Sequence, residues 1–368
     1  MFHNKTLLIR FLVFCFSLVL LPVSYLFLLS PSRNKPNILE SEKWSLYIVT
    51  VKNFLLKDHE LVDIKPLNVS PSDMHAGSEL RSYDPFVLSF LSVDGEKETY
   101  LIYEPCYFKK GQLTSSGKPS YDCNIQYSSV NLYGDFGKSY ESRILYDPRF
   151  KVSYPFPTRI QNKLGIIVES STQMDLYFLS IIHDAASKSL KVDDAYKILS
   201  NSKGYYDPNL FEDLNGNFHL ILSSSENMKV CTRLASNVTQ LSPVSSFFST
   251  TDCVDYELGD QEGERNAGSF FVDDSSGSLF RFAMNNKIQY GHSVDLYRVH
   301  SMSSDSYSQE LVRKNILNYP SLGFKLYHHV HSLDIDSSEN VHTFLIDAAV
   351  NTYTYLHGKK YIKQSPWH

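Results

Sequence analysis

The stretch YYDPNLFEDLNGNFHLILSSS, residues 205 to 225, places an Asp and a Pro before an apolar run, a turn and a second apolar run. A second stretch, SYDPFVLSFLSVDGEKETYLIYE at residues 82 to 104, has the same order. Short runs of this kind separated by a Gly-containing turn are typical of antiparallel β-hairpins. The sequence therefore predicts the same Asp-Pro hairpin twice, at Asp84 and at Asp207.

The hairpin pattern occurs three more times. YPFPTRIQNKLGIIVESS begins at Tyr154, AGSFFVDDSSGSLFRFAMNN at Ala267 and HHVHSLDIDSSENVHTFLIDAA at His328. The five starts are about 60 residues apart. A loose repeat of a few short strands, with no amphipathic helix between them, is typical of propeller blades. We expect an all-β fold, a five-bladed β-propeller over residues 46–368. The competing prediction is a β-sandwich or a pair of sandwiches.

Composition agrees with β structure and argues against one class of partner. The 368 residues include 25 Tyr and 23 Phe, which suit half-buried strands. The formal net charge is -5, and no run of Lys or Arg could follow a phosphate backbone. We therefore expect no nucleic acid partner.

The N-terminus predicts a membrane segment. Residues 11–29 carry no charge over 19 positions, which at about 1.5 Å per residue is roughly a bilayer's thickness. We expect a cytoplasmic tail at 1–10, a signal-anchor transmembrane helix at 11–29 and a stem at 30–45. The expected location is then the membrane of the Golgi or endoplasmic reticulum, with the propeller in the lumen. The alternative is a cleaved signal peptide and secretion.

Cysteines and glycosylation sequons are consistent with the lumen. Asn68 and Asn237 each begin an Asn-x-Ser/Thr sequon. Four cysteines follow the apolar segment, and short loops favour the pairs Cys106–Cys123 and Cys231–Cys253. Three pairings are open on spacing alone, and four free thiols are the alternative to disulfides.

Candidate site residues follow from the repeat. The first strand of each blade lines a propeller's channel, so Asp84 and Asp207 would face one axial cavity. Two glutamates end second strands, an arginine precedes blade four and a histidine cluster opens blade five. We place beside the two aspartates the side chains of Glu104, Glu169, Arg265 and His329, with Tyr290 and His292 as further ligand contacts.

Several carboxylates around one pocket can perform glycosidic chemistry, in which one acid is protonated and a second is ionised. We assign Asp84 as base or nucleophile, Glu169 as acid, and Asp207 as a carboxylate that sets pKa values or binds sugar. The structural alternative is that Asp-Pro only initiates a turn. No cofactor is indicated. Because His329 and His331 alone do not specify a metal, none is expected.

Several of these motifs resemble a known family. YDPFVLSF, SYPFPTRIQNKLGIIVESS, YDPNLFEDLNGNFHLILSS, RNAGSFFVDDSSGSLFRFAMNN and HHVHSLD are similar, in this order, to the N-terminal domain of plant glucosamine inositolphosphorylceramide transferase. The resemblance covers roughly residues 80 to 350. It implies a five-bladed propeller like those of arabinanase-type and xylosidase-type glycoside hydrolases. In the plant enzymes a glycosyltransferase domain follows, which the 368 residues do not include, so transferase activity is not carried over.

The sequence therefore predicts a membrane-anchored, lumenal protein that acts on a glycan or glycolipid by hydrolysis or sugar transfer. The alternative is a non-catalytic glycan-binding module that presents acceptors to a partner glycosyltransferase.

Overall fold

The computed structural model describes residues 41–362 with short gaps. The gaps are residues 57, 71–79, 92–94, 114–118, 133–138, 149–150, 171–173, 214, 225–226, 235–240, 244, 259–264, 274, 287–290, 304, 318, 320–325, 337–338 and 357–358. Across the described part of the chain, no helix combines the length and the apolar character that a membrane crossing requires. The predicted span at 11–29 lies outside the described residues, as does the sequon at Asn237.

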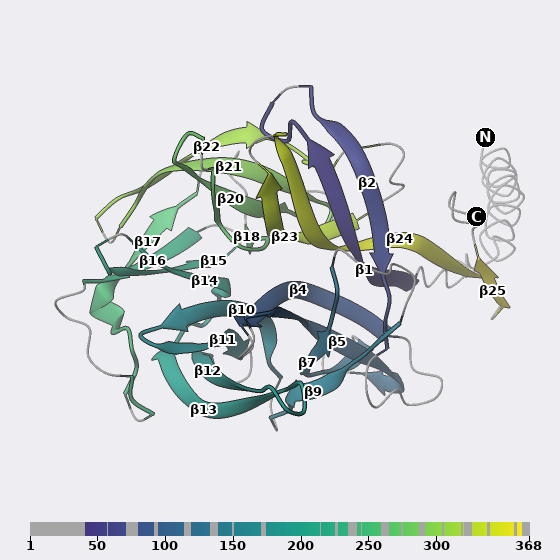
Figure 1. Ribbon diagram of the computed structural model, residues 1–368, viewed down its shortest axis with the longest axis horizontal. Helices are drawn as coiled ribbons and strands as arrows, with labels where there is room; N and C mark the ends of the chain where they lie inside the picture. Colours follow the sequence, from purple (N-terminus) through teal and green to yellow (C-terminus); the bar gives the residue numbers. More distant parts are fainter. Residues whose placement is uncertain are drawn as a thin grey trace, which may run out of the picture. The chain divides into compact units, whose positions relative to one another are not determined.

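The described residues form five antiparallel sheets around a common axis, a five-bladed β-propeller (Figure 1). The first blade is β4 (Leu80–Leu91), β5 (Lys97–Leu113), β7 (Ile125–Ser129) and β9 (Arg143–Tyr146), with β6 (Pro119–Cys123) paired to β5. The second is β10 (Ser153–Ile160), β11 (Lys163–Ser170), β12 (Asp175–Asp184) and β13 (Ser189–Leu199). The third is β14 (Tyr206–Glu212), β15 (Phe218–Ser223), β16 (Asn227–Arg233) and β17 (Cys253–Glu257), the last preceded by the 3-10 helix η2 (Thr250–Asp252).

The fourth blade is β18 (Arg265–Asn266), β20 (Ser278–Asn285), β21 (Ser293–Met302) and β22 (Tyr307–Arg313), with β19 (Phe271–Asp273) paired to β20. A short parallel pair, β3 (Val69–Ser70) with β8 (Tyr140–Glu141), lies outside the blades. The five predicted hairpins each supply strands to a different blade. The propeller prediction is confirmed, and the sandwich alternative is wrong.

The fifth blade joins the two ends of the propeller. Its order is β2 (Glu60–Leu67), β1 (Ser41–Lys52), β24 (Val341–Leu356) and β23 (Leu326–Asp336). The N-terminal strands therefore pair with the last hairpin and close the ring (Figure 1). None of the five predicted hairpins contains β1 or β2, and β1 begins at Ser41, inside the segment that was predicted as a stem.

By contact density the chain separates into two units. Lys43–Val350 is the compact unit that contains the blades. Met1–Glu42 and Asn351–His368 form the other, in which β25 (Lys359–Ile362) pairs with the end of β24, Tyr353 opposite Ile362.

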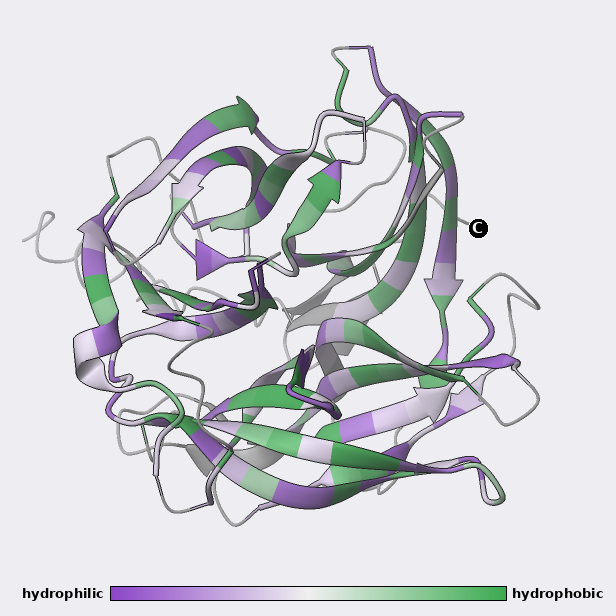
Figure 2. Cartoon of the chain, turned by 60° about the vertical axis from the view of Figure 1, so that its left-hand side comes forward, coloured by the Kyte–Doolittle hydropathy of each residue, from purple (hydrophilic) through white to green (hydrophobic). Residues whose placement is uncertain are grey.

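The core consists of apolar layers between neighbouring blades. Strand residues alternate between hydrophobic and hydrophilic along much of the sheet surface (Figure 2). Phe178 and Leu220 belong to a layer shared by blades two and three, and Phe282 and Phe344 to a layer shared by blades four and five. Burial of apolar surface contributes about 25 cal/mol of stabilising free energy for each Å² removed from water. The apolar layers are therefore the main source of stability for the ring.

Two disulfides connect neighbouring strands, in the predicted pairs. Cys106–Cys123 joins β5 to β6, and Cys231–Cys253 joins β16 to β17. In both cases the two cysteines are directly opposite each other in the ladder. The sequon residue Asn68 is exposed, between β2 and β3.

Candidate functional site

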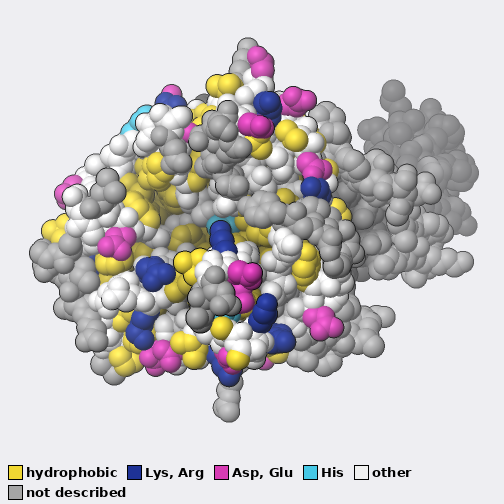
Figure 3. Space-filling view, in the orientation of Figure 1, with side chains coloured by type: hydrophobic (Ala, Val, Ile, Leu, Met, Phe, Trp, Pro, Cys, Tyr) yellow, Lys and Arg dark blue, Asp and Glu magenta, His cyan; other side chains and the backbone are white. Residues whose placement is uncertain are grey.

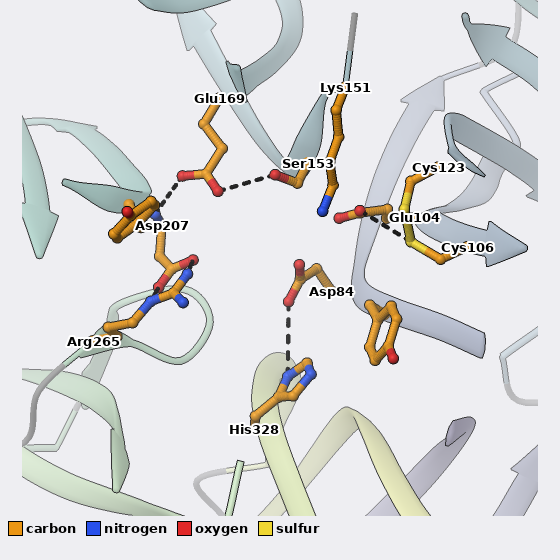
Figure 4. Close-up of a pocket in the computed structure, with 12 residues that line it drawn as sticks. Asp84, Glu104, Cys106, Cys123, Lys151, Ser153, Glu169, Asp207, Arg265 and His328 are labelled. Carbon is orange, nitrogen blue, oxygen red and sulfur yellow. Dashed lines mark hydrogen bonds and ion pairs between the residues drawn. A yellow bond between two sulfur atoms is a disulfide. The ribbon is translucent and has the colours of Figure 1, made fainter. Parts of the chain in front are cut away.

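A cavity of about 290 Å³ lies where the innermost strands of several blades meet. Figure 4 shows that the charged side chains lining this cavity come from separate blades and point toward one another. The charged residues that line it are Asp84, Glu104, Lys151, Glu169, Asp207 and Arg265. The remaining lining residues are Tyr83, Ser153, Tyr206, His328 and the Cys106–Cys123 disulfide. In the space-filling view, acidic, basic and histidine side chains lie close together near the middle of the face shown (Figure 3).

The first strands of blades one, two and three share one backbone irregularity. The ladder register shifts at Asp84-Pro85, at Tyr154-Pro155 and at Asp207-Pro208. In each case the residue before Pro has a positive φ: 48° at Asp84, 54° at Tyr154 and 56° at Asp207. Two residues then oppose one, which defines a β-bulge, and Pro is tolerated there because no ladder hydrogen bond is lost. Tyr154 is therefore the blade-two equivalent of the two aspartates.

The backbone N–H of each bulge residue is bound by the preceding blade. The Asp84 N–H donates to Asp347 Oδ2 at 2.9 Å, and the Asp207 N–H donates to Glu169 Oε2 at 2.8 Å. The Tyr154 N–H likewise bonds Glu104. We call these three contacts the inter-blade bonds. They hold non-glycine residues in the left-handed conformation, which by itself costs about 1–3 kcal/mol.

Asp207 is held as an ion pair. Arg265 donates from Nε to Asp207 Oδ2 and from Nη2 to Oδ1, each at 2.6 Å. Burial raises the pKa of Asp207, and the Arg265 charge and its hydrogen bonds oppose that rise. The guanidinium also lies 4.7 Å from the centre of the Tyr206 ring. A bidentate guanidinium holds its carboxylate in the ionised form.

Asp84 has a different environment. Burial raises the pKa of Asp84 well above its usual value, and the nearby carboxylates Glu104, Asp347 and Asp207 raise it further. Its Oδ1 is 3.9 Å from His328 Nδ1 and 3.6 Å from His329 Nδ1. Burial lowers the pKa of His328 to about 3, so this imidazole is neutral near pH 7. The pKa of Asp84 is therefore the more strongly raised of the two, because Arg265 opposes the rise at Asp207.

The other carboxylates titrate close to neutral pH. Burial raises the pKa of Glu169 to about 7 and that of Glu104 to about 7. The nearby Lys151 charge limits the rise at Glu104. Burial also raises the pKa of Asp347 to about 8. Glu169 Oε1 accepts a hydrogen bond from Ser153 Oγ at 3.0 Å, so both of its oxygens are engaged.

Most of the predicted site residues meet in this cavity. Asp84, Glu104, Glu169, Asp207 and Arg265 all line it, from four different blades. Glu104, which was predicted to end a strand, lies within β5, and Asp84, which was predicted to open one, lies within β4. The structure thus brings together the aspartates of the two Tyr-Asp-Pro motifs.

The remaining predicted residues lie elsewhere. His329 is fully buried behind Asp84 and does not line the cavity. His292 contacts Ser293 Oγ at 3.3 Å and is not a lining residue, while Tyr290 lies outside the described residues. His328 lines the cavity instead of His329, because the ladder shifts register between Tyr327 and His329 and breaks the simple alternation of faces.

Tyr154, Asp347 and Lys151 position or charge the site and were not predicted. The signal for Tyr154 was present, because Tyr154-Pro155 begins the blade-two hairpin as Asp-Pro does elsewhere. Asp347 was not among the predicted site residues, and its bond to the Asp84 N–H joins blades five and one. Lys151 precedes β10 and carried no motif, so only the fold places its charge beside Glu104.

Two groups of described residues have ligand atoms close enough to share a metal ion: Asp84 with His328 and Asp347, and Glu104 with Cys106 and Cys123. The second is unsuitable because both sulfurs are in a disulfide. In the first, both oxygens of Asp347 already accept backbone N–H groups, from Asp84 and His329. The expectation that the site uses no metal stays a prediction.

Fold and site together define a class, a five-bladed β-propeller with a carboxylate-rich pocket at its axis. The family model described as glucosamine inositolphosphorylceramide transferase 1, N-terminal, matches residues 89–343. The chain belongs to this family, and the resemblance in its motifs is confirmed.

Solved structures show only distant likeness. An α-L-arabinofuranosidase from Lactobacillus brevis is 11% identical with a TM-score of 0.42, over 67% of this chain and 81% of that one. A NanB sialidase from Streptococcus pneumoniae is 10% identical with a TM-score of 0.38, over 76% of this chain and 57% of that one. Likenesses of this size say nothing about what this chain binds. A search of curated proteins finds no match.

Proposed function

We propose that the axial cavity binds a sugar of a glycan or glycolipid and that its carboxylates act on the glycosidic bond, by hydrolysis or by transfer. The observation that carries this proposal is that Asp84 and Asp207 line one cavity, where Arg265 pairs with Asp207 and burial among other carboxylates raises the pKa of Asp84. A protonated acid beside an ionised carboxylate is what general acid catalysis with charge stabilisation requires.

The environments suggest roles that differ from the sequence-based ones. Asp84, with its strongly raised pKa, is the candidate proton donor rather than the base. Glu169, whose pKa is about 7, is the candidate proton acceptor. Asp207, neutralised by Arg265, is the candidate for binding sugar hydroxyls and stabilising positive charge on the sugar.

A second function has one observation in its favour. The carboxylates Glu104, Glu169 and Asp347 all bind backbone N–H groups of the next blade, so each has a structural role that needs no chemistry. A non-catalytic module would use the same pocket to bind a glycan and present it to a partner glycosyltransferase. For either function we propose a membrane anchor at residues 11–29 and a lumenal location in the Golgi or endoplasmic reticulum, supported by the apolar run and by the two disulfides.

The test is a screen of the full-length chain against a glycan array and a panel of sugar nucleotides, with product analysis. Binding followed by release or transfer of sugar supports the enzyme. Binding without turnover supports the module. If no glycan binds in a manner that depends on Asp84 and Asp207, the proposal is wrong.

A further inference from the structure

A second cavity of about 190 Å³ lies directly beside the axial one. The two cavities share Glu169 and Tyr206 as lining residues. The rest of the second cavity is formed by Ser170, Met174 and the segment 202–205. A ligand that extends from the axial cavity past Glu169 would therefore enter it.

Hydrogen bonds hold the walls of this second cavity in place. The Met174 N–H donates to the Ser170 carbonyl at 2.8 Å, and the Ser202 N–H donates to the Met174 carbonyl at 2.7 Å. Ser202 Oγ donates to the same carbonyl at 3.1 Å. The Asn201 N–H donates to Asp175 Oδ1 at 3.1 Å, which anchors the loop to β12. Hydrogen bonds of the fold therefore fix the described walls of this cavity.

Its walls have two chemical characters. Met174 and the rings of Tyr205 and Tyr206 form an apolar surface, while the Glu169 carboxylate and Lys203 are charged. Both rings make cation–π contacts. Lys229 Nζ is 4.5 Å from the centre of the Tyr205 ring, and the Arg265 guanidinium is 4.7 Å from the centre of the Tyr206 ring. A pyranose ring has an apolar C–H face and a hydroxyl edge, which match an aromatic wall and a carboxylate.

We propose that this second cavity is a subsite for the sugar unit linked to the one in the axial cavity. The shared Glu169 then lies at the junction between the two units, because it lines both cavities. Tyr206, which is 37% exposed, stands over the same junction. This inference rests on the proposed function of the axial cavity and specifies its ligand as at least a disaccharide.

The experiment compares free monosaccharides with disaccharides that end in the same monosaccharide, by titration calorimetry on the full-length chain. The expected result is about tenfold tighter binding of the disaccharide, the effect of about one well-placed stacking or hydrogen-bond contact. Met174→Trp fills the second cavity and should remove this advantage while monosaccharide affinity stays unchanged. Ile182→Trp, at an exposed β12 residue that lines neither cavity, is the matched control and should keep the advantage.

Equal affinity for monosaccharide and disaccharide would overturn the subsite, as would a Met174→Trp variant that keeps the advantage. If Met174→Trp fails to fold, Lys203→Ala replaces it, and a retained advantage there has the same meaning. Failure of the proposed function gives a different result: the Asp84→Asn variant then has the same sugar affinity as the parent, or neither protein binds sugar. Monosaccharide binding that depends on Asp84 but gains nothing from a second unit rejects the subsite alone.

Discussion

Asp84 and Asp207 have the same local sequence and the same left-handed backbone, yet their side chains have opposite electrostatic environments. Arg265 forms a bidentate pair with Asp207, whereas Asp84 lies among other carboxylates and neutral imidazoles. Proximity of like charges raises a carboxyl pKa, and an adjacent cation lowers it. The chemistry of each residue is therefore decided by its neighbours from other blades.

Asp84→Asn tests the proton donor. Asn tolerates a positive φ, so the bulge should persist and thermal stability should change little. If Asp84 donates a proton, turnover on a responsive glycan should fall by about 10²- to 10⁴-fold, measured as kcat/KM. Unchanged turnover would reject the role of Asp84 as acid.

Arg265→Gln tests the ion pair. The variant leaves the buried Asp207 carboxylate without its cation, which should destabilise the domain by about 3 kcal/mol and abolish sugar binding. Denaturant unfolding gives the stability change. The double variant Arg265→Gln, Asp207→Asn removes the unpaired charge and should recover most of the stability. A single variant as stable as the parent would show that the pair contributes nothing to the fold.

At the scale of elements, the cavity is assembled from repeated bulges and from one disulfide. The inter-blade bonds connect blade five to one, one to two, and two to three at the same ladder position. Asp175 on β12 and Asp295 on β21 show a second repeat, since each accepts an N–H from a residue just after the last strand of its blade, Asn201 and Asn315. These bonds explain why acidic residues recur in the repeat without all being part of the chemistry.

The two disulfides provide a matched pair for testing the cavity wall. Their sequence separations are 17 and 22, so removing either by Cys→Ser substitution at both ends should cost a similar free energy of unfolding, about 3 kcal/mol. Only Cys106–Cys123 lines the cavity, so only its removal should also weaken sugar binding. Equal binding by the two double variants would show that the disulfide wall does not contact the ligand.

At the scale of the whole molecule, many buried ionisable groups make the fold sensitive to pH. Glu104, Glu169 and Asp347 have raised pKa values, about 7, 7 and 8, so the folded state binds their protons more tightly than the unfolded state does. Stability from these groups is complete below their unfolded pKa values and is lost as pH rises through the folded ones. Burial lowers the pKa of the buried histidines, so below pH 6.5 only the unfolded state takes up their protons. These histidines therefore reduce the stability of the fold as the pH falls below 6.5.

Between pH 6.5 and 8, therefore, the carboxylates dominate, and the melting temperature should fall as pH rises. Differential scanning calorimetry at constant ionic strength measures this. In Glu169→Gln the fall should be smaller, because a neutral amide cannot lose a proton. A melting temperature that rises over this interval would contradict the raised pKa values.

The number of blades, the favoured disulfide pairs and most of the cavity's charged residues could be predicted from the sequence, although spacing alone left three cysteine pairings open. These follow from local rules: alternating runs and turns mark hairpins, and equivalent positions in a repeat converge on one axis. Asp84, Glu104, Glu169, Asp207 and Arg265 could all be predicted in this way, since each belongs to a hairpin, or directly precedes one, whose position the repeat defines.

The pairing of these residues and the shifts of their pKa values depend on contacts that form only in the folded ring. Arg265 meets Asp207 across two blades, Asp347 reaches the Asp84 N–H across the closure of the ring, and a register shift makes His328 rather than His329 a lining residue. The pairing of β1 with β24 joins residues that are nearly 300 positions apart. Long-range contacts and burial set each carboxyl pKa. Neither can be deduced from the spacing of a motif, because both depend on which strands lie side by side in the folded ring.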